Sequence, residues 1–335
     1  MAKKGYSRMT KIQPAVQKMF FAIPNWDGVS SADTYHTIDL SQCASLMNRR
    51  FYRQGINWAV ADVKIHVTNR IGSEYIKPGQ SVSVAKLPNT WVMSNAWEKG
   101  FRAWKRQQDE ALSDGTQESV KARFNDFKIY ADAEHAALTT AGNLLPFDSL
   151  GNAALPGEWE PSQIVIPNYG APGNNYEPFI TAVGDYVGGA AGSISLIKAY
   201  QSSRGVPQSP DPAVPAGVTN TDNIWRALFD VGDNNEDVLE NVVGKNNDLP
   251  YVQDDYPGGS LQMPGLEWHD QIQIFSPSGV AGVGLGTQRG KGGNFPCGLI
   301  RIDWTPDGQA ANLVIQIDLV PGSHRGYLCE SMMEM

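Results

Sequence analysis

Three arginines and two aromatic residues are interleaved in one short segment that is well suited to binding nucleic acid. Arg49, Arg50 and Arg53 flank Phe51 and Tyr52. A guanidinium group can hold a phosphate through two parallel hydrogen bonds, and an aromatic face can stack on an unpaired base. The segment therefore predicts a contact with single-stranded nucleic acid. The open alternative is a helix end whose aromatics enter the core and whose arginines are solvated or pair with acidic neighbours.

The first 18 residues form a mildly basic arm with little hydrophobic pattern. Its basic residues are Lys3, Lys4, Arg8 and Lys11, followed by Lys18 at its end. So few positive charges would bind phosphates weakly and with a steep dependence on salt. Many copies acting together can compensate for weak single contacts. We expect a second nucleic-acid contact in this arm.

The glycine-rich segment 282–292 does not have the spacing of a phosphate-binding loop. Leu285 stands where a P-loop requires glycine, and Gly292 stands where it requires serine or threonine. We expect a flexible loop here. The alternative is an interface or anion-binding loop that uses Arg289 and Lys291.

Histidine and cysteine are too scattered to predict a metal site or a disulfide framework. The five histidines lie far apart, the three cysteines lack CxxC spacing, and no GxSxG motif is present. With 35 acidic residues, any carboxylate pair that could be chosen is best explained by chance. We therefore expect no enzyme, no metal and no cofactor.

Charge is distributed unevenly along the chain. Residues 1–130 carry 19 Lys and Arg against 11 Asp and Glu, a net of +8, whereas residues 131–335 carry 8 against 24, a net of −16. Such polarity makes nucleic acid a plausible partner for one face of an acidic protein. The alternative is that the two halves interleave in the fold and their charges mix.

The hydrophobic pattern predicts a mainly β protein with long loops and a few short helices. The chain contains 34 Gly and 21 Pro, and its apolar residues recur mostly in short alternating runs. No run approaches the roughly 18 apolar residues of a membrane span, so we expect no membrane insertion. The predicted strands are 19–23, 34–40, 58–67, 81–87, 127–131, 160–167, 179–187, 193–200, 271–275, 298–304 and 313–320.

Local signals add helices, caps and one irregularity to this pattern. Helices are predicted over 42–53 and 95–112, with Ser41 and Ser94 as their N-caps. Two shorter helices are predicted over 223–229 and 235–243, after a long loop at 205–220. Trp58 and Val60 are out of phase with Val63 and Ile65, which predicts a bulge near Ala61.

Several segments resemble capsid proteins of small circular Rep-encoding single-stranded DNA viruses. They are residues 39–46 (DLSQCASL), 48–55 (NRRFYRQG), 58–61 (WAVA) and 319–327 (LVPGSHRGY). The resemblance implies a single jelly-roll β-sandwich over residues 19–335, preceded by the arm at 1–18. One departure is that the arm lacks the dense arginine run of many relatives, which shifts the expected DNA contact towards Arg49, Arg50 and Arg53 and towards the basic face of the helix predicted over 95–112.

The resemblance also implies a structural function. The chain would assemble with itself into a small icosahedral shell of about 60 copies that encloses circular single-stranded DNA. Its location would be the virion, assembled inside the host cell, with nuclear assembly left open, and its host receptor is unspecified. Two other classes remain as alternatives: a carbohydrate-binding β-sandwich that uses the nine Trp and 12 Tyr, and a glycan hydrolase on a β scaffold.

Overall fold

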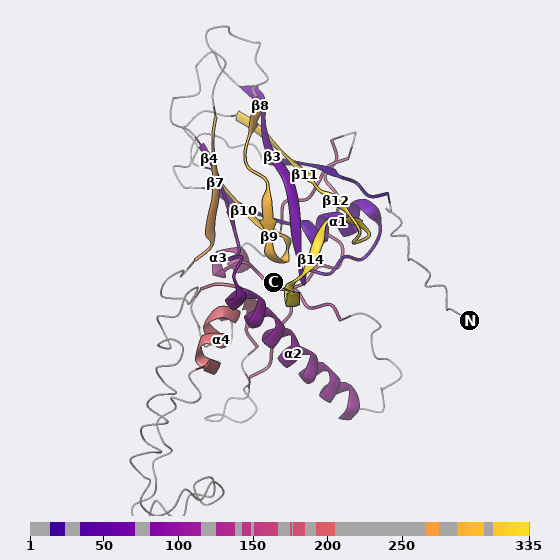
Figure 1. Ribbon diagram of the computed structural model, residues 1–335, viewed down its shortest axis with the longest axis vertical. Helices are drawn as coiled ribbons and strands as arrows, with labels where there is room; N and C mark the ends of the chain where they lie inside the picture. The colour runs from indigo at the N-terminus through magenta and orange to yellow at the C-terminus, as the bar shows by residue number, and fades with distance from the viewer. Residues whose placement is uncertain are drawn as a thin grey trace, which may run out of the picture.

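Two antiparallel sheets dominate the computed structural model of the chain (Figure 1). One sheet has the order β1-β11-β3-β14, with β8 and β9 also paired to β3, and the other has the order β2-β10-β4-β7. The fold is thus mainly β, as the sequence predicts. The structure describes residues 14–23, 34–70, 81–114, 125–137, 143–148, 151–166, 175, 177–184, 192–204, 265–274, 287–304 and 311–334.

The strands of the first sheet come from both ends of the chain. They are β1 (Lys18–Ile23), β3 (Ile56–Arg70), β8 (Thr287–Arg289), β9 (Gly293–Phe295), β11 (Ala311–Leu319) and β14 (Cys329–Ser331). The second sheet contains β2 (Thr34–Asp39), β4 (Ser81–Lys86), β7 (Glu267–Gln273) and β10 (Leu299–Trp304).

The pairing of these strands is nested. β1 pairs with β11, β2 with β10, β3 with β8 and β9, and β4 with β7, all antiparallel. The first strand of the chain therefore pairs with a strand near the C-terminus, and each following strand pairs with one that lies further from the C-terminus. Successive pairs alternate between the two sheets, so the chain is arranged as one long hairpin that passes through both sheets.

One hydrophobic core fills the space between the two sheets. Met19 and Phe21 of β1, Ile302 of β10, and Ile315 and Ile317 of β11 are all buried in it. The alternation of buried and polar residues along these strands is what places one face of each sheet on this core.

The predicted bulge is confirmed at Ala61. Asp318 of β11 is opposite Asp62, but the next residue, Leu319, is opposite Val60, so Ala61 is the extra residue of β3. The bulge brings Trp58 and Val60 onto the buried face already occupied by Val63 and Ile65.

A second core lies beside the sandwich, where helix α2 (Trp91–Asp114) and helix α4 (Leu196–Arg204) pack together below the sheets in Figure 1. Ile180 of β5 (Phe179–Thr181) belongs to this core; β5 pairs in parallel with β6 (Ser193–Ser195), and helix α3 (Ala133–Ala137) contacts β5. The C-terminal residues form a hairpin of β12 (Pro321–Gly322) and β13 (Gly326–Tyr327), then β14 and a 3₁₀ turn, η5 (Met332–Glu334). None of the helices in the described ranges is long and apolar enough to cross a membrane.

Both predicted N-caps are wrong, because the helices begin earlier. Asp39 caps α1 (Leu40–Asn48) by accepting hydrogen bonds from the backbone N–H groups of Ser41 and Gln42. Thr90 precedes α2, and its hydroxyl accepts from the N–H of Met93. Ser94 is instead inside α2, where it bonds the carbonyl of Met332.

Four predicted strands are absent or shorter in the structure, and one of them, predicted over 179–187, ends at Thr181. Residues 127–131 and 160–167 form only isolated bridges in their described parts. The strand predicted over 193–200 ends at Ser195, because the Ser195 hydroxyl accepts from the N–H of Lys198 and starts α4. The helices at 223–229 and 235–243 and the loop at 205–220 lie outside the described residues.

Candidate nucleic-acid interface

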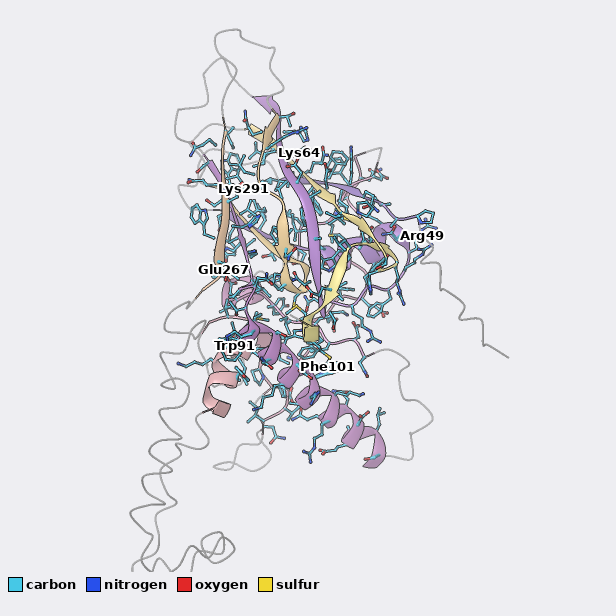
Figure 2. The ribbon with its side chains drawn as sticks, in the orientation of Figure 1. Arg49, Lys64, Trp91, Phe101, Glu267 and Lys291 are labelled. Carbon is cyan, nitrogen blue, oxygen red and sulfur yellow. The ribbon has the colours of Figure 1, made fainter. Side chains whose placement is uncertain are left out.

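The arginine segment leaves α1 through a sharp turn of the backbone. The helix ends at Asn48, five residues before the predicted end, since Arg49 adopts a left-handed conformation with φ of 52°. The N–H groups of Arg49 and Arg50 both bond the carbonyl of Ser45 and close the helix. The turn leaves Arg49, Arg50 and Arg53 exposed on one side of the molecule, where Figure 2 labels Arg49.

Tyr52 is part of the core rather than a platform for a base. Its ring is buried and contacts Trp58 at 5.8 Å and Tyr327 at 5.5 Å between ring centroids. Its backbone N–H donates to the hydroxyl of Ser45 at 2.9 Å. The structural alternative is therefore confirmed for Tyr52, while Phe51 remains partly exposed and lies 6.3 Å from Trp159.

The structure adds Arg325, which the sequence reasoning missed, to the arginine segment. Arg325 lies in the β12–β13 hairpin with φ of 50°, and its guanidinium donates to the carbonyl of Phe51 at 2.6 Å. Its own carbonyl accepts from the Tyr52 hydroxyl at 3.0 Å. The resemblance included residues 319–327, but no pattern in the sequence indicated that Arg325 lies beside Arg53.

A cavity of about 520 Å³ opens between these two segments. Arg53 and Arg325 both line it, and Glu330 is the acidic residue among its lining side chains. Two guanidinium groups facing one cavity of this size can hold a phosphate group, with the partly exposed ring of Phe51 at its wall. The remaining lining residues are Gly55, Ile56, Ser323, His324, Cys329 and Ser331.

His324 is a titratable residue in the lining of this cavity. Burial lowers the pKa of His324, and the positive charge of Arg325 lowers it further. A phosphate bound at the two arginines would oppose both effects, because a nearby negative charge favours imidazolium.

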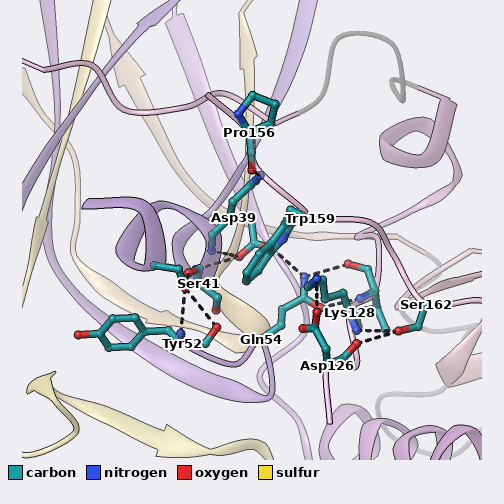
Figure 3. A network of polar contacts seen from close by, with 12 residues as sticks. Asp39, Ser41, Tyr52, Gln54, Asp126, Lys128, Pro156, Trp159 and Ser162 are labelled. Carbon is teal, nitrogen blue, oxygen red and sulfur yellow. Dashed lines mark hydrogen bonds and ion pairs between the residues drawn. The ribbon is translucent and has the colours of Figure 1, made fainter. Parts of the chain in front are cut away.

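A buried polar network holds the arginine segment in place (Figure 3). Asp39 accepts hydrogen bonds from Gln54 at 3.0 Å and from Trp159 at 2.8 Å, in addition to its two helix-capping bonds. Gln54, next to Arg53, also bonds both backbone groups of Ile129. Arg53 thus projects from a backbone that is fixed on its buried side.

The basic arm is the other predicted DNA contact. Lys3, Lys4, Arg8 and Lys11 lie outside the described residues, so their role as a DNA contact remains a prediction.

The described part of the glycine-rich segment is strand β8 over residues 287–289 and has no regular secondary structure over residues 290–292. Arg289 belongs to β8, with its Nε 3.9 Å from Asp62, and the N–H of Lys291 bonds Asp270 at 2.7 Å. Arg289 pairs with Lys64 of β3. Lys64 is about 26 Å along the strand from Ile56, the residue of β3 nearest the arginine segment, at a rise of about 3.3 Å per residue. The alternative anion site is thus remote from the arginine segment.

The basic side of α2 is partly compensated by acidic residues of the same helix. Arg102 pairs with Glu98 and Arg106 pairs with Glu110, each four residues apart. Within the described ranges, no group of three or more His, Cys, Asp or Glu could hold a metal ion. The cavity beside Arg53 and Arg325 is therefore the stronger candidate for binding a polyanion.

Comparisons with known proteins add no relative to this description. No protein-family model, no curated protein and no solved structure matches the chain.

Proposed function

We propose that the chain is a capsid subunit that assembles into a small icosahedral shell around single-stranded DNA. The subunit itself would be a single jelly roll. The observation that carries the proposal is the nested pairing of β1 with β11, β2 with β10, β3 with β8 and β9, and β4 with β7. A jelly roll is a double sheet of eight strands in two Greek keys, and viral capsid domains are built on it.

The arginine cavity supports the nucleic-acid part of the proposal. Arg53 and Arg325 line one cavity, and Arg49 and Arg50 are exposed beside it. Arginine binds phosphates without regard to base sequence, which is what packaging a whole genome requires. The partly exposed ring of Phe51 can stack on any unpaired base.

Electron microscopy of the purified full-length chain tests the proposal. We expect closed particles of uniform diameter, and elution far ahead of the 36.5 kDa single chain on size exclusion. A chain that stays monomeric at high concentration over a range of salt and pH would contradict shell formation.

Carbohydrate binding is the second candidate, because lectin domains also use the jelly roll. Trp268 on β7 is 64% exposed and could stack on a sugar ring. Glycan-array binding that is lost in Trp268→Ala, from a chain that forms no particles, would favour this candidate over the capsid.

A further inference from the structure

A second cavity, of about 270 Å³, lies between α2 and α4 on the side of the molecule away from the sheets. Residues of both helices, of β5 and β6, and of the segment 164–166 line it. Its wall is almost entirely hydrocarbon, and its main contributors are Gly100, Ala103, Ile164, Ile180, Ile194 and Ala199.

Small residues on α2 explain why the cavity exists. Ala96, Gly100 and Ala103 follow one another at helical spacing and face α4. At Gly100 the helices are already in close contact, since a Cβ there would lie 2.4 Å from a methyl group of Leu196. Beyond this point Ala103 and Ala199 are too short to fill the space. An apolar space of this size can hold a small hydrocarbon ligand.

Among the described residues that line the cavity, one is charged. Lys99 is the charged residue among the lining side chains, and its ammonium group lies 5.9 Å from the ring centroid of Tyr200, which also lines the cavity. Lys99 is exposed, so its ammonium group can reach a ligand from solvent. A positive charge at the mouth of a hydrocarbon cavity is complementary to a molecule with a carboxylate at the end of an alkyl chain.

We propose that this cavity binds a medium-chain fatty acid, with the alkyl chain among the isoleucines and the carboxylate at Lys99. The cavity holds about nine water-sized volumes of roughly 30 Å³ each, which suits a chain of about ten carbons. The site is separate from the arginine cavity and does not depend on shell assembly or on DNA.

Calorimetric titration of the full-length chain with decanoate, and in parallel with uncharged decanol, tests the site. We expect saturable binding of decanoate at one site per chain. Lys99→Gln should weaken decanoate about threefold and leave decanol unchanged, because an exposed charge pair contributes modestly. Ala199→Leu, which fills the cavity, should weaken both ligands at least about tenfold.

Two controls keep the result decisive. Lys105→Gln removes a positive charge from the same helix outside the cavity lining and should change neither titration. If Ala199→Leu does not give the wild-type circular dichroism spectrum, Ala103→Leu fills the same cavity from α2. Absence of saturable decanoate binding to the wild-type chain, or binding that survives a folded filling variant, overturns the proposal. An equal loss of decanoate and decanol in Lys99→Gln overturns the role of the charge.

Discussion

Arg325 gains its place in the cavity entirely from tertiary structure. Its guanidinium bonds the carbonyl of Phe51, and its carbonyl is bonded by Tyr52, although both partners lie more than 270 positions earlier in the chain. These contacts fix Arg325 beside Arg53, whereas Arg53 itself is exposed to the cavity. The two arginines therefore differ: Arg325 is structural as well as cationic, and Arg53 is the cleaner probe of ligand binding.

Arg53→Gln is expected to weaken binding of a single-stranded oligonucleotide about fivefold, since a solvent-exposed charge contact contributes up to about 1 kcal/mol. The loss of one phosphate contact should also reduce the slope of log affinity against log salt by about 0.7. Fluorescence anisotropy of a labelled oligonucleotide at several salt concentrations measures both. Arg102→Gln is the matched control, because Arg102 is exposed on α2 and paired with Glu98. Equal effects of the two variants would mean that binding depends on net charge alone.

Asp39 and His135 are two buried titratable residues joined by one chain of hydrogen bonds. Asn143 accepts from the ring of His135 and donates to Gln42, whose backbone N–H bonds Asp39. Burial raises the pKa of Asp39 to about 6, although its four hydrogen bonds favour the carboxylate. Burial lowers the pKa of His135 to about 4. The His135 ring accepts the N–H of Ala131, which requires a neutral imidazole.

These two residues should have opposite effects on stability between pH 4 and 6.5. The pKa of Asp39 is about 6 in the folded chain and 3.8 in the unfolded chain. Its contribution to the free energy of unfolding therefore falls by about 3 kcal/mol as pH rises from about 4 to about 6. The pKa of His135 is about 4 in the folded chain and 6.5 in the unfolded chain. Its contribution to the free energy of unfolding therefore rises by about 3 kcal/mol as pH rises from about 4 to 6.5. In the wild-type chain the two trends offset each other.

Replacing one residue should expose the trend of the other. Relative to wild type, Asp39→Asn should gain stability as pH rises from 4 to 6, and His135→Gln should lose stability as pH rises from 4 to 6.5. Urea denaturation of each chain at a series of pH values measures the difference from wild type, in which the effects of the other carboxylates cancel. Parallel curves for wild type and both variants would contradict the opposing roles.

At the scale of elements, the bulge of β3 sets a requirement on the strand beside it. Gly292 precedes β9 and packs directly on the backbone of the bulge, so that a Cβ there would lie 2.2 Å from the carbonyl oxygen of Ala61 and 2.5 Å from that of Val60. Backbone atoms cannot move aside as the end of a flexible side chain can. Position 292 therefore has room only for glycine.

Gly292→Ala is accordingly expected to destabilise the fold by about 1–3 kcal/mol, the usual cost of forcing atoms into a packed site. Gly265→Ala is the matched control, since Gly265 has open space around its Cβ position and no left-handed backbone. Chemical denaturation of both variants gives the comparison. Similar stabilities would show that β9 can move away from β3 at no cost.

Sequence pattern predicted the long strands and the bulge because each depends on local alternation. The pattern gave wrong helix starts where a single side chain caps the helix. Asp39 and Thr90 cap α1 and α2 earlier than the predicted caps Ser41 and Ser94, and Ser195 caps α4 where the pattern predicts that the strand continues. It also identified the arginine segment but not Arg325, because that contact joins opposite ends of the chain. Long-range pairing is what local periodicity does not contain.

At the scale of the whole molecule, the strand registers define two opposite ends of the sandwich. The C-terminal residues of β1, β3, β7 and β10 lie at one end, because Ile23 pairs with Leu313 near the start of β11 and Trp304 pairs with Val82 near the start of β4. The arginine segment precedes the first residue of β3, so it lies at the opposite end of the sandwich, together with α1 and the C-terminal hairpin (Figure 1). In a shell, that opposite end would be the side that meets DNA.

For the proposed capsid subunit, this arrangement predicts that assembly and DNA packaging can be separated. The triple variant Arg49→Gln, Arg50→Gln and Arg53→Gln should still form particles, because it leaves both sheets and the two cores unchanged. In a shell of about 60 copies it removes about 180 positive charges, enough to neutralise about 180 nucleotides. Particles should therefore contain less DNA, seen as a lower ratio of absorbance at 260 nm to that at 280 nm and as empty shells by electron microscopy.

The triple variant Arg102→Gln, Lys105→Gln and Arg106→Gln on α2 removes the same charge and should keep its DNA. Equal loss of DNA in both would assign packaging to total charge rather than to the arginine cavity.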